Sequence, residues 1–469
     1  MLWDNQIPTI FELISRFNKH KVYLLTCDTS LKSCPANAFK KFYLCLNCKN
    51  LRNHYLEILN VENISLKLNK SKINEEEILN QTRNIQDFND LTSYRYENVP
   101  IGELVSSQLC DNEQSYILDN NFFLNKHEII NSEILSAIKL YERSKNIIKE
   151  KKIEKVYVWN GRRPSDGPVN YAAKNLSIPF KSFISNEKGR YHLVRGEKVH
   201  SYTETMKEFD KTYNYYKNKI SVQEKEEIFK EYINKKKTGS LKKENFLHED
   251  FTCNFKKKID KKNLVTFFTS SGFEFAGFND WKSPIYSNQY DAIKKIIFDP
   301  NLDRNINLCI RYHPNLQKAG RSEINIIQEI LKIKKKNLIQ ISYDDEIDSY
   351  DILNKSLKVL TFRSTISYEA YAKKIPVISL GPSFDDYAGF AYKPKNHDEV
   401  ISMINNNLIP KVSEKSINHA LLFKKKLYAF RYRSVSNINE IYYFKNKKIK
   451  PALSFLFKLK IFLIKKIFN

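Results

Sequence analysis

The sequence predicts an α/β protein of two domains, each built around a parallel sheet, with the two sheets facing a central cleft. Short apolar runs of strand length alternate with segments of helical periodicity, as expected for strands joined by crossover helices. The chain has 469 residues, too many for one ordinary hydrophobic core, so two domains are expected. Polar residues follow several of the strands, which is typical of parallel strands that end at a ligand site.

The first half contains three predicted strands, at residues 21–26, 155–159 and 179–184. Helical periodicity is clearest over residues 131–152, and a shorter helix is expected over residues 171–176. Strand, helix and strand at these spacings favour parallel pairing, because a parallel connection needs about a dozen residues to cross back over the sheet.

The second half repeats this alternation after a stretch rich in Lys and Glu, residues 205–262, whose last part we interpret as a linker. Strands are predicted at 264–268, 308–312, 338–341, 359–362 and 377–380, and helices at 290–298, 323–332 and 349–355. The predicted organisation is a Rossmann-like N-terminal domain over 1–240, a basic linker over 241–262, a Rossmann-like C-terminal domain over 263–440 and a tail over 441–469.

The charge of the chain favours anionic partners. Its 78 Lys and Arg residues against 53 Asp and Glu residues give a net charge of +25. No zinc finger, RNP aromatic pair or basic zipper accompanies the charge, so no nucleic-acid partner is expected. Glycine-rich phosphate loops are also not expected, because the chain has only 11 Gly and neither a G-x-G-x-x-G nor a Walker motif.

The carboxyl-terminal tail is the segment that most resembles a membrane-surface helix. Residues 452–468 combine large apolar side chains with Lys as the sole charged residue. Such a helix can lie in the headgroup region of an anionic membrane, whereas it is too short and too charged to span one. Without a secretory signal or a spanning segment, we expect a cytoplasmic protein that is peripheral at the inner membrane face. The alternative is a terminal helix packed on the protein.

Four cysteines lie close together in the first half. They are Cys27, Cys34, Cys45 and Cys48. Four thiols suffice for a tetrahedral structural zinc site, and the last two have the C-x2-C spacing of such sites. The wider spacing of the first pair leaves two other interpretations open, an iron–sulfur cluster or buried cysteines without metal.

Two motifs in the second half carry the functional prediction. Arg311 and His313-Pro314 stand at the end of one predicted strand, and Ser364-Thr365 stands at the end of another, with Glu369 one turn later. The carboxyl ends of parallel strands and the amino ends of the helices that follow them bind anions. A Ser or Thr can also serve only as a helix cap, and a His-Pro pair can simply end a strand. Their occurrence together, in this order, favours a nucleotide-sugar site.

Residues of the second half resemble the bacterial capsule-polysaccharide synthesis glycosyltransferases, a group with the GT-B fold that includes the Kdo transferases of capsule assembly. The residues that carry the resemblance are Thr269-Ser270-Ser271 with Glu274, Arg311-Tyr312-His313-Pro314-Asn315, Ser364-Thr365 with Glu369, Lys374-Ile375-Pro376 and Gly381-Pro382. The first half is similar to relatives of this group at residues 100–107 and at Asn160-Gly161-Arg162. The resemblance covers about residues 20–400 and implies the GT-B fold for both halves.

The resemblance also implies roles for individual residues. His313 and Arg311 would contact the donor's phosphate, Ser364 and Thr365 would hold phosphate oxygens, and Glu369 would bind the nucleotide. The remaining donor-site residues that it implies are Ser270, Ser271, Glu274 and Pro314. No cofactor would be required for catalysis, since Arg, His and helix N-termini can stabilise the leaving phosphate in place of a metal.

The catalytic base and the acceptor site are expected in the first half. A carboxylate is the usual base for an acceptor hydroxyl, and Asp28 and Glu187 are the best-placed candidates, ahead of Glu103 and Asp166. Asn160-Gly161-Arg162 follows a predicted strand and suits an acidic acceptor, although the same residues also fit a turn with solvated arginines.

These observations predict a glycosyltransferase that moves a sugar from a nucleotide-sugar donor onto a capsular or other surface polysaccharide, or onto a lipid-linked glycan. The His-Pro resemblance favours a CMP-linked acidic sugar, and UDP- and GDP-sugars stay open. One alternative is an enzyme like the UDP-sugar 2-epimerases, which share the fold. A second is a non-catalytic scaffold at the membrane surface.

Overall fold

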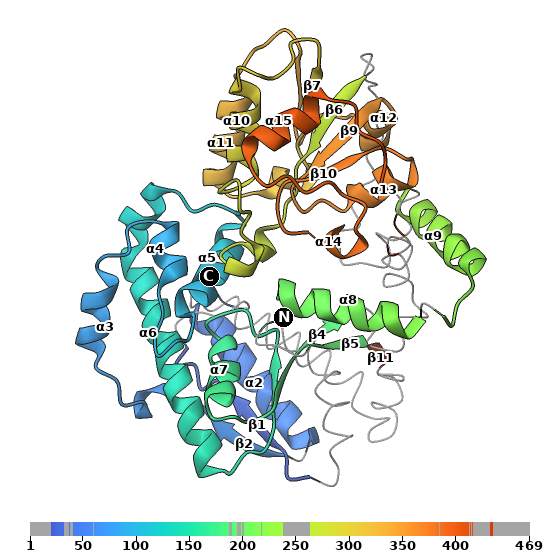
Figure 1. The fold of residues 1–469 in the computed structure, drawn as a ribbon. Helices are drawn as coiled ribbons and strands as arrows, with labels where there is room; N and C mark the ends of the chain where they lie inside the picture. Colours follow the sequence, from blue (N-terminus) through green and yellow to red (C-terminus); the bar gives the residue numbers. More distant parts are fainter. Residues whose placement is uncertain are drawn as a thin grey trace. The chain divides into compact units, whose positions relative to one another are not determined.

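The computed structural model shows a chain folded into two compact units (Figure 1). Unit 1 comprises Met1–Asn112, Asn120–Val199 and Ala429–Asn469, and unit 2 comprises Glu113–Asp119 and His200–Tyr428. The structure describes residues 20–31, 37, 41–59, 61–186, 190–194, 198, 201–216, 218–237, 263–383, 385–411, 413, 415 and 432–434. The predicted linker over 241–262 and the tail over 441–469 both lie entirely outside these residues.

Unit 2 is built on a five-stranded sheet in which every pair of neighbours is parallel. The strands in chain order are β6 (Leu264–Phe268), β7 (Asn307–Arg311), β8 (Leu338–Ile341), β9 (Ser356–Thr361) and β10 (Val377–Ser379). Their spatial order is β10-β9-β6-β7-β8, so β6 is central, and all five of its residues are buried. All five predicted strands of the second half are confirmed.

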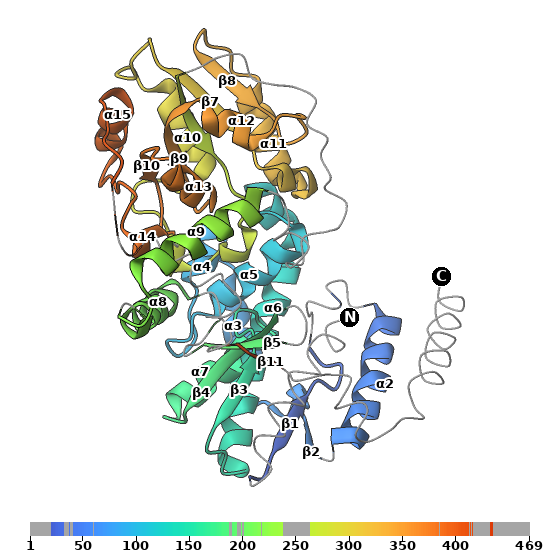
Figure 2. The ribbon, with the colours of Figure 1, turned by 90° about the vertical axis from the view of Figure 1, so that its right-hand side faces the viewer.

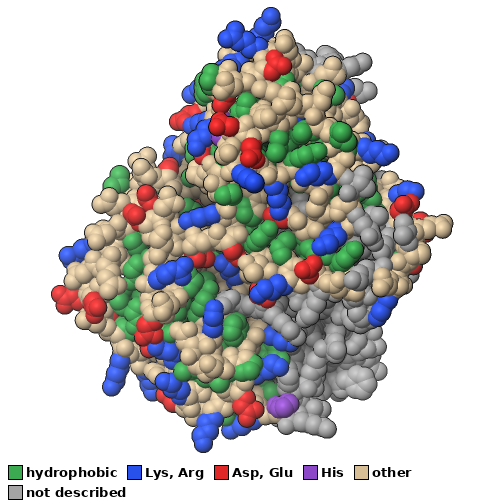
Figure 3. Space-filling view, in the orientation of Figure 1, with side chains coloured by type: hydrophobic (Ala, Val, Ile, Leu, Met, Phe, Trp, Pro, Cys, Tyr) green, Lys and Arg blue, Asp and Glu red, His purple; other side chains and the backbone are tan. Residues whose placement is uncertain are grey.

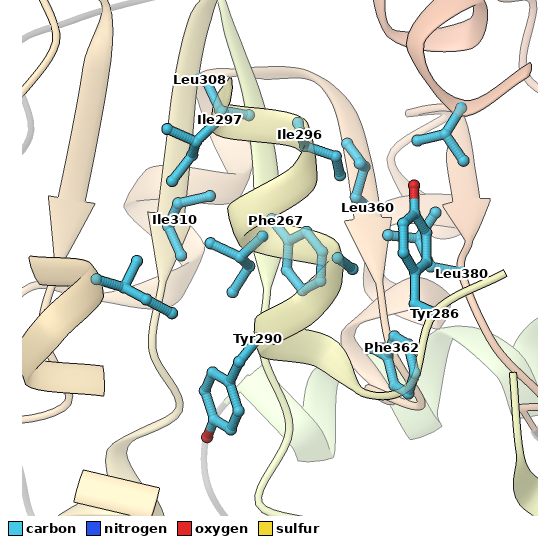
Figure 4. Packing of buried hydrophobic residues seen from close by; sticks show 14 of the residues in the cluster. Phe267, Tyr286, Tyr290, Ile296, Ile297, Leu308, Ile310, Leu360, Phe362 and Leu380 are labelled. Atoms are coloured by element: carbon cyan, nitrogen blue, oxygen red, sulfur yellow. The ribbon is translucent and has the colours of Figure 1, made fainter. Parts of the chain in front are cut away.

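Helices cover both faces of this sheet. They include α10 (Gln289–Phe298), α11 (Arg321–Leu331), α12 (Ser349–Asn354), α13 (Ile366–Ala372) and α15 (His397–Asn405). Because side chains alternate along a strand, Val265 and Phe267 of β6 pack in one core with α10 and α11, while Leu264 and Phe268 pack in another with α12 and α13. Figure 4 shows Phe267 in the first of these cores. The expected α/β fold with a parallel sheet is thereby confirmed.

Two helices that lie within residues 1–240, the predicted first domain, are part of unit 2. They are α8 (Tyr202–Tyr216) and α9 (Val222–Lys237). Aromatic contacts hold them there: Phe209 of α8 lies 5.4 Å from Tyr387, and Phe229 of α9 lies 6.0 Å from Tyr371, measured between ring centroids. The division between the units therefore falls near residue 200 rather than after residue 240.

Unit 1 contains two smaller sheets. β1 (Tyr23–Thr26) pairs in parallel with β2 (Glu62–Ser65). The second sheet has the order β11-β5-β4-β3, and Figure 2 shows its strands side by side. Its strands are β3 (Val156–Trp159), β4 (Phe180–Asn186), β5 (Arg190–Val194) and β11 (Tyr432–Ser434). β3 and β4 are parallel, as predicted, whereas β5 and β11 add antiparallel pairs, so unit 1 departs from an all-parallel sheet.

Unit 1 also contains several helices. They are α2 (Phe42–Leu59), α3 (Glu75–Thr82), α4 (Phe88–Ser93), α5 (Ile101–Glu113), α6 (Asn120–Glu150) and α7 (Gly167–Asn175). In the described part of the chain, no helix combines the length and the apolar character needed to cross a membrane. On the face drawn in Figure 3, Lys and Arg side chains are scattered among Asp and Glu rather than gathered in one patch.

Candidate functional site

The carboxyl ends of β9, β6 and β7 meet at one edge of the sheet of unit 2, because these strands are parallel neighbours. We call the loops that follow them, residues 362–365, 269–272 and 312–315, the edge site. Neighbouring strands lie about 4.8 Å apart, so three strands span about 10 Å. That span is short enough for one ligand to reach all three loops, as expected for ligands of parallel sheets.

Thr269 links two loops of the edge site. The side chain of this buried residue accepts a hydrogen bond from the backbone N–H of His313, with 2.8 Å between Oγ1 and N. Its own N–H donates to the carbonyl of Arg311 at 3.1 Å. The ends of β6 and β7 are thereby held together, which limits the positions that His313 can take.

A backbone amide selects the tautomer of the His313 ring. His313 precedes the short helix η5 (Pro314–Lys318), and its Nδ1 accepts from the N–H of Asn315 at 3.1 Å. A neutral imidazole that accepts through one nitrogen carries its proton on the other. Nε2 of this half-buried ring is therefore the hydrogen-bond donor, as a leaving phosphate would require.

Gln289 holds the loop after β6. Its amide accepts from the N–H of Ser270 and donates to the carbonyl of Ser270, both at 2.9 Å. Within the described part of the chain, the hydroxyls of Ser270 and Ser271 make no side-chain hydrogen bond. Glu274 lies in the next turn, η3 (Phe273–Phe275), and its side chain is outside the described structure.

The loop after β9 carries Ser364 and Thr365. Thr365 precedes α13 with helical backbone angles, and its side chain does not cap the helix. Ser364 is half-buried, and its hydroxyl makes no hydrogen bond with the described residues. Neither residue is therefore explained by the simple capping interpretation. Glu369 is 5% exposed and accepts from the hydroxyl of Tyr350 at 3.4 Å, so its carboxylate lies beside α12.

Arg311, which was predicted to contact the donor's phosphate, is directed into the protein. Its guanidinium donates to the carbonyls of Ser342 and Ile347, and the residue is 2% exposed. It fastens the loop after β8 to the end of β7. The structure therefore favours a positioning role for Arg311, because these carbonyls occupy two of its donor groups.

A different arginine, Arg363, lies in the edge site itself, and the sequence analysis did not identify it. It is the second residue after β9, is 8% exposed and has a left-handed backbone with φ 67°. Its Nη2 donates to the carbonyl of Trp281. The signal available in the sequence was an arginine directly before Ser364-Thr365 at a strand end.

The predicted acceptor residues lie in unit 1, after β3. Asn160 and Gly161 have left-handed backbones, with φ 63° and 75°. Arg162 is 4% exposed and donates to Ser107 at 2.8 Å and to both oxygens of Asp111 at 2.7 and 3.0 Å. The guanidinium is neither solvated nor open to a ligand in this arrangement. A direct contact between Arg162 and an acceptor stays a prediction.

The candidate bases of unit 1 differ in their surroundings. The Asp28 carboxylate accepts from the backbone N–H and the hydroxyl of Ser30. Asp166, at the start of α7, accepts from the N–H of Arg163 at 3.0 Å. Burial raises the pKa of Asp166 to about 6, and the neighbouring Arg163 charge opposes the rise. Glu187 lies outside the described residues.

The cysteine cluster is only partly described, since Cys34 falls in residues 32–36, which the structure leaves out. Cys27 Sγ accepts from the N–H of Thr29, and Cys45 Sγ accepts from the side chain of Asn37, each at 3.2 Å. Among the residues described, no three His, Cys, Asp or Glu side chains are arranged to hold a metal ion. The zinc hypothesis stays a prediction for the four thiols together.

No protein-family model and no curated protein matches the chain. Among solved structures, KpsC beta Kdo 2,7 transferase from Thermosulfurimonas dismutans aligns over 60% of this chain and 80% of its own length, at 12% identity and TM-score 0.34. UDP-GlcNAc 2-epimerase from Methanocaldococcus jannaschii, in complex with UDP-GlcNAc and UDP, aligns over 78% and 93%, at 14% identity and TM-score 0.29. Alignments with TM-scores this low do not establish a shared activity, so we base the proposed function on the edge site.

Proposed function

We propose that the chain is a glycosyltransferase whose edge site binds a nucleotide-sugar donor. The observation that supports the proposal is that the loops after three adjacent parallel strands carry His313, Ser270, Ser271 and Ser364. Hydroxyls and an imidazole N–H at such an edge suit a phosphate group flanked by sugars.

The proposed chemistry follows from the geometry of His313. In transfer, the bond between the sugar's anomeric carbon and the phosphate oxygen breaks, and that oxygen gains negative charge. The Nε2–H of His313 donates a hydrogen bond to the phosphate as the charge develops, which stabilises the transition state more than the bound donor. The acceptor hydroxyl forms the new bond and loses its proton to a carboxylate of unit 1. The candidates are Asp28 and Glu187, followed by Glu103 and Asp166.

The finer parts of the proposal concern the substrates. A CMP-linked acidic sugar is the favoured donor, with UDP- and GDP-sugars as the alternatives, and the acceptor is a surface polysaccharide or a lipid-linked glycan. The net charge of +25 supports attraction to such anionic substrates and to anionic membranes. The tail over 441–469 would bring the enzyme to the inner membrane face.

A thermal-shift and turnover experiment tests the proposal. CMP, UDP, GDP and their sugars are each added to the full chain, and the matching nucleotide is expected to raise the melting temperature because it binds only the native state. Turnover should then release free nucleotide, which an epimerase does not do when the sugar stays attached. A chain that none of these compounds stabilises would contradict the proposal and favour the scaffold interpretation.

His313→Ala provides the matched variant. It should reduce turnover by about 100-fold, the usual effect of losing one donor to a developing anion, with little change in melting temperature. His20→Ala is the control, because His20 is an exposed residue of unit 1. Equal turnover by His313→Ala and the wild type would exclude the assigned role of His313.

A further inference from the structure

Arg363 is a buried cation without a carboxylate neighbour. Within the described part of the chain it forms no ion pair, and the carbonyl of Trp281 is the acceptor for its guanidinium. Its Nε is buried and has no hydrogen-bond partner there. A buried charge normally lies beside an opposite charge, because transfer out of water is costly unless a counter-charge and hydrogen bonds replace the solvent.

Aromatic rings surround the guanidinium and fix its position. Its central carbon lies 5.1 Å from the ring centroid of Tyr116, 5.2 Å from that of Phe362 and 5.8 Å from that of Trp281. Rings at these distances attract a cation, but they cannot accept the strong hydrogen bonds that a carboxylate or phosphate accepts. The cage therefore holds Arg363 in place and leaves its Nε–H without an acceptor.

The backbone at Arg363 is also unusual. A φ of 67° is unfavourable for a residue with a long side chain, and such strain persists where the surrounding structure imposes it, often at functional sites. Here the strain occurs at the turn from β9 into α13, inside the edge site. A glycine would adopt this turn more easily, so the presence of arginine calls for another explanation.

We infer that Arg363 forms an oxyanion subsite of the edge site. The inference rests on the proposed function and identifies a charge that this function needs. Arg363 lies in the edge site itself, whereas Arg311 donates to two carbonyls of the loop after β8. The oxyanion is the phosphate of the nucleotide or the carboxylate of an acidic sugar, since a guanidinium binds either through paired N–H donors.

Binding measurements on the full chain test the role of Arg363. Arg363→Met is expected to weaken binding of the matching nucleotide-sugar by about 10- to 100-fold, and Arg363→Lys by less, because Lys keeps the charge and loses the planar donor fork. The control is Arg304→Met, which removes an exposed arginine of the same unit. Circular dichroism and melting temperature show whether each variant is folded.

The choice of ligand separates the two sources of the oxyanion. If the phosphate is bound, Arg363→Met weakens CMP, UDP-sugars and CMP-linked acidic sugars alike. If the sugar carboxylate is bound, the loss is confined to the acidic sugar donor. The inference would be overturned if Arg363→Met bound every ligand of the wild type with the same affinity as the wild type. The proposed function would then remain in place.

Inorganic phosphate distinguishes failure of this inference from failure of the proposed function. One outcome is that no nucleotide binds the wild type, but phosphate raises the melting temperature of the wild type and not that of Arg363→Met. In that case the oxyanion subsite stands and the nucleotide-sugar function fails. If neither nucleotides nor phosphate stabilise the wild type, both are wrong.

Discussion

At the scale of single residues, similar side chains in similar sequence positions have different surroundings. Arg311 and Arg363 each stand at the end of a strand of the same sheet. The first donates to two carbonyls of the loop after β8, whereas the second lies in an aromatic cage in the edge site. The same contrast holds in unit 1, where Arg162 is bound by Asp111. Residue type alone therefore does not identify the arginine that binds a ligand.

Thr269 offers a test of the contact that holds His313. Thr269→Val keeps the shape of the side chain and removes the acceptor for the His313 N–H. We expect the free energy of unfolding to fall by about 1–3 kcal/mol, because a buried N–H is left without a partner, and turnover to fall with it. Urea denaturation measures the first effect. Thr269→Ser restores the hydroxyl and should recover most of both losses; a Ser variant as impaired as Val would contradict this explanation.

The raised pKa of Asp166 predicts a dependence of stability on pH. Because its pKa rises from 3.8 to about 6 on folding, the folded protein binds this proton more tightly than the unfolded chain. The stability contributed by the protonated carboxyl is fully present below about pH 4 and is lost as pH rises through about 6.

Comparison of the wild type with Asp166→Asn isolates this effect, since the amide does not titrate. Relative to the variant, the wild type should lose about 1–2 kcal/mol of unfolding free energy between pH 4 and pH 7. Thermal denaturation at a series of pH values measures the difference. Parallel pH profiles for the two proteins would show that the Asp166 pKa is not raised.

At the scale of elements, packing assigns segments to units in ways that chain order does not indicate. α8 and α9 belong to unit 2 through aromatic contacts, although they precede the predicted linker. Residues 113–119 also belong to unit 2, where the N–H of Tyr116 donates to the buried carboxylate of Glu323 at 2.9 Å. This short segment places the Tyr116 ring beside Arg363.

Gly320 tests the attachment of that segment. Its N–H donates to the carbonyl of Gln114 at 2.9 Å, and a methyl group added at Gly320 would lie 2.1 Å from the backbone oxygen of Glu113. Because a backbone atom cannot move aside cheaply, Gly320→Ala should reduce the free energy of unfolding by about 1–3 kcal/mol. Ser322→Ala, a neighbouring substitution that adds no atoms, is the control. Equal urea midpoints for the two variants would contradict the close approach.

At the scale of the whole molecule, charge and the two-unit organisation bear on function. The net charge of +25 is spread along the chain, and the tail over 441–469 carries eight Lys without Asp or Glu. The tail lies outside the described residues, so its membrane role stays a prediction from sequence. The proposed donor groups occur in unit 2, and the candidate bases occur in unit 1.

Deletion of residues 441–469 tests the predicted membrane contact. Each Lys near an anionic surface contributes about 1 kcal/mol, so the full chain should bind phosphatidylserine vesicles far better than the truncated chain, and less well as salt increases. Vesicles of phosphatidylcholine alone serve as the control. Cosedimentation that is equal for the two chains would exclude the tail as the membrane-binding segment.

The parallel sheet of unit 2 and the positions of His313 and Ser364 at strand ends followed from sequence patterns. Strand length, helical periodicity and polar residues after a strand are local properties that residues near in the chain produce together. The mixed sheet of unit 1 was not predicted, because pairing depends on which strands meet in space. β11 pairs with β5 across more than two hundred residues of chain, and no short pattern specifies that contact.

Only the tertiary structure decided which partner each polar side chain has. Arg311 donates to the carbonyls of Ser342 and Ile347. Arg363 lies beside the rings of Tyr116 and Trp281 and donates to the carbonyl of Trp281. These contacts join residues far apart in sequence, so they form only when the tertiary structure forms. The availability of a buried charge for a ligand is therefore a property of the fold, whereas the strand ends that bear such charges are already visible in the sequence.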